Sequence, residues 1–164
     1  MTLDGFNDAD RDDAIAFLRP CLDVDRWCAD LADGRPYASV DALAARAEAA
    51  ASPFTRAEVD GALAHHPRIG ERPAGSGAEA AMSRAEQAGV DPADAEVAAA
   101  LERGNRAYEE RFGRVFLIRA AGRSSRDILE ALSERLTHTA EEEEPVVADQ
   151  LRQIAVLRLK GLLA

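Results

Sequence analysis

Along most of the chain, apolar residues recur every three or four positions, which is the spacing of one buried face of a helix. The clearest series are Val97, Leu101, Tyr108 and Phe112; Ile128, Leu129, Leu132 and Leu136; and Val147, Leu151, Ile154, Val156, Leu157 and Leu159. One further run, Val115–Ile118, is β-like but too short and isolated for a sheet. The pattern predicts an all-α protein with one short extended segment.

Capping residues, prolines and glycines divide this pattern into about eight helices. The predicted helices are one around Ala14–Leu18, stopped by Pro20; one capped by Asp23 or Asp25 and ended by Gly34; one from Ser39 to about Ala51; one from the capping box Thr55–Glu58 to His65-His66-Pro67; Ala78–Ala88, ended by Gly89; one capped by Asp91-Pro92 and reaching Arg111; one capped by Ser124 or Ser125 and passing Leu136; and one after the acidic run Glu141–Glu144. We find no repeat and no long linker. The expected architecture is a single-domain helical bundle over residues 1–164.

The composition indicates a soluble globular protein. Apolar residues make up 47% and charged residues 30% of the 164 residues, and a chain of this length can bury a real core. The formal net charge of -10 at pH 7 argues against nucleic-acid binding, which needs a basic surface. Arginines cluster between Arg106 and Arg126, so a site for an anionic small molecule stays open.

The cysteines and the chain ends favour a cytoplasmic location. Cys21 and Cys28 form neither a CxxC pair nor a set with metal-ligand spacing, so we expect reduced, buried thiols. No apolar run approaches the roughly 20 residues that span a bilayer. The acidic stretch Met1–Asp13 is unlike a secretory or transit peptide, and Gly161–Ala164 is unlike a peroxisomal signal.

Two adjacent histidines, His65 and His66, stand where Pro67 forces the chain out of a helix. A residue before proline is pushed toward extended backbone, so His66 should sit at a helix end with its ring free to project. The unperturbed pKa of histidine lies nearest neutrality, which suits proton transfer. The alternative is a helix C-terminus whose histidines only favour the helix dipole.

Ser83, Glu86 and Gln87 have the i, i+3 and i+4 spacing that puts side chains on one helix face. They would offer a hydroxyl, a carboxylate and an amide as one polar cluster. The alternative is a capping box, because Ser83-x-x-Glu86 also has that form. The strong helix formers Ala78–Met82 should extend the helix upstream of Ser83, which favours the polar cluster.

A third stretch combines Asn105, Tyr108 and Phe112, which share a helix face. Aromatic residues at this spacing are more often part of a core than contacts to a ligand. The run after Gly113 is different. Without a sheet, its backbone N–H and C=O groups must find other partners, and a heterocyclic ligand could supply them. The arginines that could pair with a carboxylate are Arg119, Arg123, Arg126 and Arg158.

Four motifs, taken together, resemble the OHCU decarboxylase family, whose substrate is 2-oxo-4-hydroxy-4-carboxy-5-ureidoimidazoline (OHCU). They are His66-Pro67-x-Ile69-Gly70, Ser83-x-x-Glu86-Gln87, Asn105-x-x-Tyr108 and Phe112-Gly113. Flanking matches are Cys21, Trp27, Arg35-Pro36-Tyr37, Arg135-Leu136, Ile154-Ala155 and Arg158-Leu159. Each motif is weak alone, but their order and spacing over nearly the whole chain make the resemblance specific.

The resemblance implies an all-helical carboxy-lyase without cofactor or metal, which converts OHCU to (S)-allantoin and CO2 as the last step of urate breakdown. It implies His66 as the catalytic acid/base and Glu86 as its carboxylate partner. It also implies substrate binding by Pro67, Ser83 and Gln87 and by the backbone around Phe116, Leu117, Ile118 and Arg119, and we add Arg158 as a candidate. Family members commonly pair through helices, so we expect a homodimer that binds neither nucleic acid nor membrane.

This sequence departs from the family at two places. Arg114-Val115 replaces a usual Phe-Pro, which could alter substrate contacts, and His138 replaces a frequent Asn, which we expect to affect packing. The alternatives in function are an enzyme for a related ureide or imidazolone on the same scaffold, and a non-catalytic helical ligand-binding domain. A metal site built from His65, His66, Glu71 and His138 is disfavoured, because no HxxxH or HxxE pair supports it.

Overall fold

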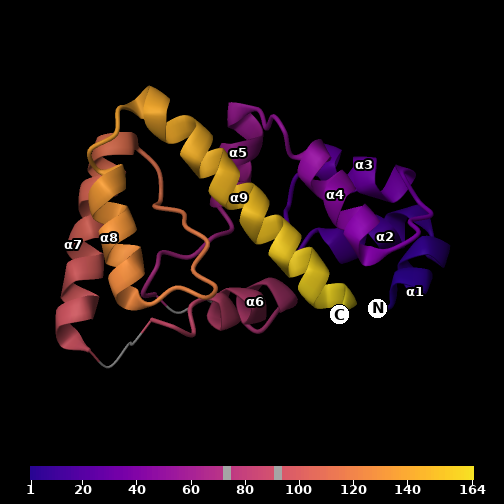
Figure 1. Ribbon diagram of the computed structural model, residues 1–164, viewed down its shortest axis with the longest axis horizontal. Coiled ribbons are helices and arrows are strands. Elements are labelled where there is room, and N and C mark those ends of the chain that lie inside the picture. The colour runs from indigo at the N-terminus through magenta and orange to yellow at the C-terminus, as the bar shows by residue number, and fades with distance from the viewer. Residues whose placement is uncertain (72–74, 91–93) are drawn as a thin grey trace. The chain divides into compact units, whose positions relative to one another are not determined.

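The computed structural model describes residues 1–71, 75–90 and 94–164, and these ranges contain helices but no strand (Figure 1). The nine helices of these ranges are α1 (Leu3–Asp8), α2 (Arg11–Leu18), α3 (Asp25–Asp33), α4 (Val40–Ala50), α5 (Arg56–Leu63), α6 (Ala78–Glu86), α7 (Ala95–Phe112), α8 (Ser125–Arg135) and α9 (Ala140–Leu163). Residues 115–120 lie outside any helix, as expected of the extended segment. The predicted all-α fold is confirmed.

The described chain divides into two compact units. Unit 1 comprises Met1–Ala62 and Arg152–Ala164, and unit 2 comprises Leu63–Leu151. Helix α9 contributes its first half to unit 2 and its second half to unit 1. The expectation of a single domain over residues 1–164 stays a prediction. None of the helices in the described ranges is both long and apolar enough to cross a membrane.

Unit 1 is built on α2, α3 and α4, each of which packs against the next. Trp27 of α3 is completely buried, and its indole N–H donates a hydrogen bond to the Ala47 carbonyl of α4 at 3.0 Å. Cys21 and Cys28 are buried thiols, as predicted. Burial raises the pKa of the Cys28 thiol to about 11, so this thiol stays protonated and unreactive at neutral pH.

Three of the predicted helix caps are confirmed. The Ser39 hydroxyl accepts a hydrogen bond from the Ala42 N–H, and the Thr55–Glu58 and Ser124–Asp127 pairs each form a reciprocal capping box. In such a box, the two side chains satisfy N–H groups that the helix leaves without partners. Local sequence therefore determines where α4, α5 and α8 begin.

The predicted cap of α3 is wrong. The N-cap residue is Val24, whose side chain makes no capping hydrogen bond. The carboxylates of Asp23 and Asp25 instead both accept from Arg19 Nη1, at 2.7 and 2.8 Å. The arginine at the end of α2 thus competes successfully for the two side chains that were expected to cap α3.

Two helix starts differ from prediction, and a third lies outside the described residues. Helix α1 was not predicted; it is capped by Thr2, whose hydroxyl accepts from the Gly5 N–H. Helix α9 begins at Ala140 and so includes the acidic run Glu141–Glu144, because Thr139 forms a capping box with Glu142, a member of that run. The predicted cap Asp91-Pro92 falls outside the described residues, and the observed N-cap of α7 is Asp94.

In unit 2, α7 lies beside α8 (Figure 1). An apolar cluster forms the core of this unit. The buried members of this cluster are Ile69, Val90, Leu101, Tyr108, Phe116, Ile118, Ala120, Ile128 and Leu132. Gly104 of α7 approaches α8 so closely that a Cβ atom built there would lie 2.3 Å from Leu132 Cδ2. The absence of a side chain at Gly104 therefore permits the observed approach of the two helices.

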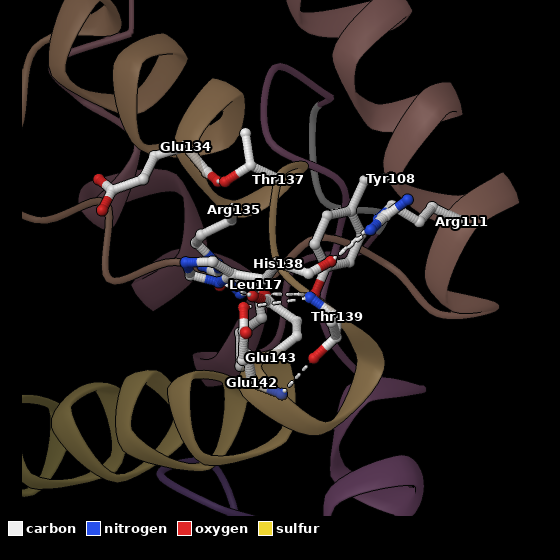
Figure 2. Close-up of polar contacts among 10 residues, drawn as sticks. All are labelled: Tyr108, Arg111, Leu117, Glu134, Arg135, Thr137, His138, Thr139, Glu142 and Glu143. Atoms are coloured by element: carbon white, nitrogen blue, oxygen red, sulfur yellow. Dashed lines mark hydrogen bonds and ion pairs between the residues drawn. The ribbon is translucent and has the colours of Figure 1, made fainter.

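A buried polar cluster joins α7, α8 and α9 within unit 2 (Figure 2). Glu143 and Arg135 are 2% and 5% exposed, and Arg135 Nε donates to Glu143 Oε1 at 2.7 Å. The Tyr108 hydroxyl donates to the same oxygen at 2.7 Å, and His138 Nδ1 lies 2.9 Å from Oε2. Burial, and then the hydrogen bond to Glu143, raise the pKa of Tyr108 above its usual range. His138, expected to affect packing, thus contacts a carboxylate.

The extended segment is held by side chains of α8 and α9. Arg135 Nη1 donates to the Leu117 carbonyl at 2.6 Å, and the Arg135 guanidinium lies 4.6 Å from the Phe116 ring centroid. The backbone N–H of Arg119 donates to Gln150 Oε1 at 2.9 Å. We predicted that the backbone of this segment needs hydrogen-bond partners other than a sheet. The protein itself supplies two of them, Arg135 and Gln150.

Replacing Gly104 by alanine should destabilise the protein by about 1–3 kcal/mol, the usual cost of overpacking a core, because the new methyl group would displace Leu132. The matched control is Gly61→Ala in α5, where a Cβ atom would meet nothing within 4 Å. The control should gain about 0.5–1 kcal/mol, since alanine loses less backbone entropy in a helix. Urea unfolding measures both changes, and equal changes would contradict this account.

We expect Glu143→Gln to lower the free energy of unfolding by about 3–5 kcal/mol, because it leaves Arg135 buried without its counter-charge. The control is Glu142→Gln, one residue earlier, where the carboxylate accepts from the exposed Thr139 N–H. Glutamine also serves at that position of a capping box, so the control should cost less than about 1 kcal/mol. Denaturant unfolding followed by circular dichroism compares them, and similar stabilities would show that the buried charge pair is dispensable.

Candidate active site

His66 lies in the segment from Ala64 to Glu71 that follows α5, which we call the turn. The helix ends at Leu63, and the N–H of His66 donates to the Leu63 carbonyl at 3.1 Å. His65 is exposed, whereas His66 and Pro67 are half-buried. The chain therefore leaves the helix before Pro67, as predicted, although the helix stops slightly earlier than expected.

A pocket of about 420 Å³ opens beside this turn. It is lined by Ala64–Pro67 on one side and by Gly77, Glu79, Ala80 and Ser83 of the α6 region on the other. Three of the predicted site residues, His66, Pro67 and Ser83, thus line one pocket. An imidazole and a hydroxyl on the wall of one pocket can together transfer a proton and hold a polar ligand.

Ser83, Glu86 and Gln87 lie at the C-terminal end of α6. The N-cap of this helix is Gly77 and its C-cap is Gln87, so Ser83 does not cap the helix and the capping-box alternative is wrong. Ser83 is buried, and Glu86 and Gln87 are half-buried. The pairing of Glu86 with His66 stays a prediction.

Gln87 contacts the backbone of the turn that carries His66. Its Oε1 accepts a hydrogen bond from the Gly70 N–H at 2.9 Å. Gly70 has a φ angle of +90°, in the left-handed region that favours glycine. A second pocket, of about 470 Å³, is lined by Arg68–Glu71 of this turn and by residues of α7. Successive residues of one turn therefore line two different pockets.

The predicted site residues of the extended segment are largely in the core. Phe116, Leu117 and Ile118 are buried, and Arg119 is half-buried. None of the four is among the described residues that line the pocket at His66. Their contact with a substrate stays a prediction.

The remaining predicted residue, Arg158, belongs to unit 1. It is buried, and its Nη1 donates to the Pro20 carbonyl at 3.1 Å. A substrate-binding role for Arg158 stays a prediction as well. Arg114, which stands at one of the positions where this sequence departs from the family, forms an ion pair with Glu144 of α9. Arg114 Nη2 and Glu144 Oε1 are 3.1 Å apart.

Two residues of this region were not identified from the sequence as site residues. Glu79 lines the pocket and precedes Ser83 by one helical turn, so their shared helix face was the available signal. Asn105, which belongs to one of the four motifs but was not named as a site residue, donates from Nδ2 to the Ile69 carbonyl at 3.0 Å. No local signal could have shown this contact, because the two residues are 36 positions apart. Within the described ranges, no group of three or more His, Cys, Asp or Glu side chains could hold a metal ion.

Known proteins with a similar fold include one OHCU decarboxylase solved in the presence of (S)-allantoin. The two structures agree with a TM-score of 0.74 at 20% sequence identity, over 94% of this chain and 99% of that chain. A solved (S)-allantoin synthase matches with a TM-score of 0.72 at 18% identity, over 99% of this chain and 54% of that chain. At these identities, the likeness shows a shared fold.

Sequence comparison is more specific. A 2-oxo-4-hydroxy-4-carboxy-5-ureidoimidazoline decarboxylase of Amia calva is 34% identical over 132 residues, which are 79% of this chain and 75% of that protein. One of Haloferax volcanii is 30% identical over 162 residues, which are 97% of this chain and 94% of that protein. The family model for OHCU decarboxylase matches residues 7–160. By these matches, the chain belongs to the OHCU decarboxylase family.

Proposed function

We propose that the protein catalyses the decarboxylation of OHCU to (S)-allantoin and CO2, without a cofactor, as the last step of urate breakdown. Membership of the family and two relatives named for this reaction support the proposal. The observation that carries it is the pocket lined by His66, Pro67 and Ser83. Its wall includes the side chain best suited to proton transfer near neutral pH.

The chemistry makes few demands on the protein. The bond between the ring carbon and the carboxylate breaks, and its electron pair enters the adjacent C=N system of the substrate. An electron-sink cofactor is therefore unnecessary. The protein has to hold the carboxylate out of the ring plane, stabilise the resulting anion and deliver a proton to one face of the carbon. In this proposal the protonated imidazole of His66 delivers that proton.

Neighbouring side chains complete the proposed site. Glu86 would orient the His66 ring and stabilise its protonated form. Ser83 and Gln87 would hydrogen-bond the ureido and ring amide groups, because both residues can donate and accept. Since Gln87 Oε1 accepts from the Gly70 N–H, the amide nitrogen of Gln87 would be the group that donates to the substrate.

The substrate carboxylate needs a cation or N–H donors. We propose Arg119 and Arg158 as the candidates for this cation, since an arginine guanidinium can bind a carboxylate through two hydrogen bonds. Pro67 and the segment Phe116–Ile118 would provide the remaining contacts, chiefly through backbone groups. On the basis of the family resemblance, we further propose a homodimer located in the cytoplasm.

The first test compares His66→Gln with His65→Gln in the conversion of freshly generated OHCU, with chiral analysis of the allantoin. The wild-type protein should form (S)-allantoin faster than the uncatalysed reaction, and added chelator should have no effect. His66→Gln should abolish this activity, because His66 is the half-buried histidine before proline. The exposed His65 is the control, and His65→Gln should be tolerated. Racemic product at the uncatalysed rate from the wild-type protein would refute the proposed function.

The second test concerns the charge of Glu86. Glu86→Gln retains shape and hydrogen bonding but removes the charge that would stabilise a protonated His66, so turnover should fall by about 10²–10⁴. The melting temperature should change little, because half-buried polar substitutions of this kind usually cost less than about 1 kcal/mol. Turnover and melting temperature are measured on the same preparation. Unchanged turnover would remove Glu86 from the mechanism.

A further inference from the structure

The peptide unit between Ile69 and Gly70 is held at both of its polar ends by amide side chains. Asn105 Nδ2 of α7 donates to the Ile69 carbonyl at 3.0 Å. Gln87 Oε1, at the end of α6, accepts from the Gly70 N–H at 2.9 Å. The C=O and N–H of one peptide are thereby fixed from two different elements. Since a peptide unit is planar, these two bonds determine the orientation of its plane.

Only one of the two polar atoms of the Asn105 amide has a partner among the described residues. Asn105 is 5% exposed, and its Oδ1 is buried without a hydrogen-bond partner among the described residues. A buried acceptor without a partner is unfavourable. Exchanging the amide oxygen and nitrogen would not help, because it would direct an oxygen at the Ile69 carbonyl. The amide therefore serves as a donor to the turn, and an apolar side chain of similar size would avoid the unsatisfied oxygen.

The turn that Asn105 holds also carries the proposed proton donor. His66 and Pro67 line the pocket of about 420 Å³, and the Ile69–Gly70 peptide follows within three residues. The Ile69 side chain is part of the apolar cluster of unit 2. Ile69 is thus anchored in the core, its carbonyl is held by Asn105, and only two residues separate this anchor from His66. One of them is Pro67, whose ring fixes its φ angle.

The other contact of the turn with α7 is of a different kind. Arg68 Nε lies 2.5 Å from Glu109 Oε1, but both side chains are in contact with solvent. Exposed ion pairs contribute little and are screened by salt. Of the two polar contacts between the turn and α7, the buried amide is therefore the stronger, and the Arg68–Glu109 pair supplies a matched control on the same turn and the same helix.

We propose that Asn105 is a positioning residue, which fixes the Ile69–Gly70 peptide and through it the place of His66 in the pocket. The proposal rests on the proposed function, in which His66 delivers a proton to one face of the substrate. Misplacement of a reacting group by about 1 Å can cost on the order of 10²-fold in rate. Loss of the Asn105 donor should therefore lower turnover and relax the choice of face, without removing any group that touches the substrate.

The experiment compares Asn105→Leu and Asn105→Ala with the control Glu109→Gln. Neither leucine nor alanine can donate to the Ile69 carbonyl, and the smaller alanine avoids a steric clash should leucine prevent folding. Rates are expressed per folded protein, measured by circular dichroism, at enzyme concentrations where the uncatalysed reaction is negligible. We expect kcat to fall by about 10- to 100-fold with KM changed by less than about twofold, and the enantiomeric excess of (S)-allantoin to fall. Glu109→Gln should leave kcat and the enantiomeric excess unchanged.

A readout independent of activity comes from the three histidines of the chain. Their imidazole signals in NMR spectra can be assigned with His65→Gln and His66→Gln. In the Asn105 variants the His66 signal should shift or broaden, whereas the His138 signal, in the polar cluster around Glu143, should stay. A merely structural role would lower the folded fraction without changing the enantiomeric excess of the remaining folded enzyme.

The outcomes separate the two proposals. Unchanged kcat, enantiomeric excess and His66 signal in the Asn105 variants, with an active wild-type protein, would overturn the role of Asn105 alone. A wild-type protein that forms no (S)-allantoin above the uncatalysed rate would overturn the proposed function, and the role of Asn105 in that reaction with it. The NMR comparison would then still report whether Asn105 sets the position of His66.

Discussion

The ion pair between Arg135 and Glu143 is the interaction on which unit 2 depends most. Two charges that are almost fully removed from water carry a large desolvation cost, which their attraction offsets only when the remaining polar atoms are also satisfied. Here Tyr108 and His138 contact the carboxylate, and the Leu117 carbonyl accepts from the guanidinium. The arrangement joins α7, α8, α9 and the extended segment. It explains how a segment without sheet partners can run through the core of a helical protein.

The candidate site follows a similar principle on a smaller scale. The helices provide the framework, while the proposed chemistry lies on a turn whose backbone is held by side chains from elsewhere, as is common for functional loops. Gln87 and Asn105 act on the backbone around Gly70, just as Arg135 and Gln150 act on the segment 117–119. In both places, amide or guanidinium groups replace the hydrogen bonds that a regular element would have supplied. Such contacts give an irregular segment a defined conformation.

The sequence predicted the structure correctly where the interacting residues are close together in the sequence. Ser39, Thr55 and Ser124 cap helices through residues three positions away, and the apolar spacing of α7 and α8 identifies their buried faces. Prediction failed where a distant or competing partner decides. Asp23 and Asp25 had the right chemistry for a cap, but Arg19 binds both.

The same distinction applies to the candidate site. His66, Pro67 and Ser83 could be found because they stand in short motifs, and they do line one pocket. The role of Asn105 could not be found, since its partner is far away in the sequence. Glu143 was hidden for another reason. An acidic run at the start of a helix is usually solvated, and only the fold brings Tyr108, Arg135 and His138 to one of its members.

The position of the single tryptophan has a spectroscopic consequence. Trp27 is the chain's only tryptophan and is completely buried in unit 1. Its fluorescence therefore follows the unfolding of Met1–Ala62 and the chain end packed with it, whereas far-ultraviolet circular dichroism follows the helices of both units. Coincident curves from the two signals are the mark of one cooperative transition. The chain thus carries a built-in reporter of whether its two compact units unfold together or one after the other.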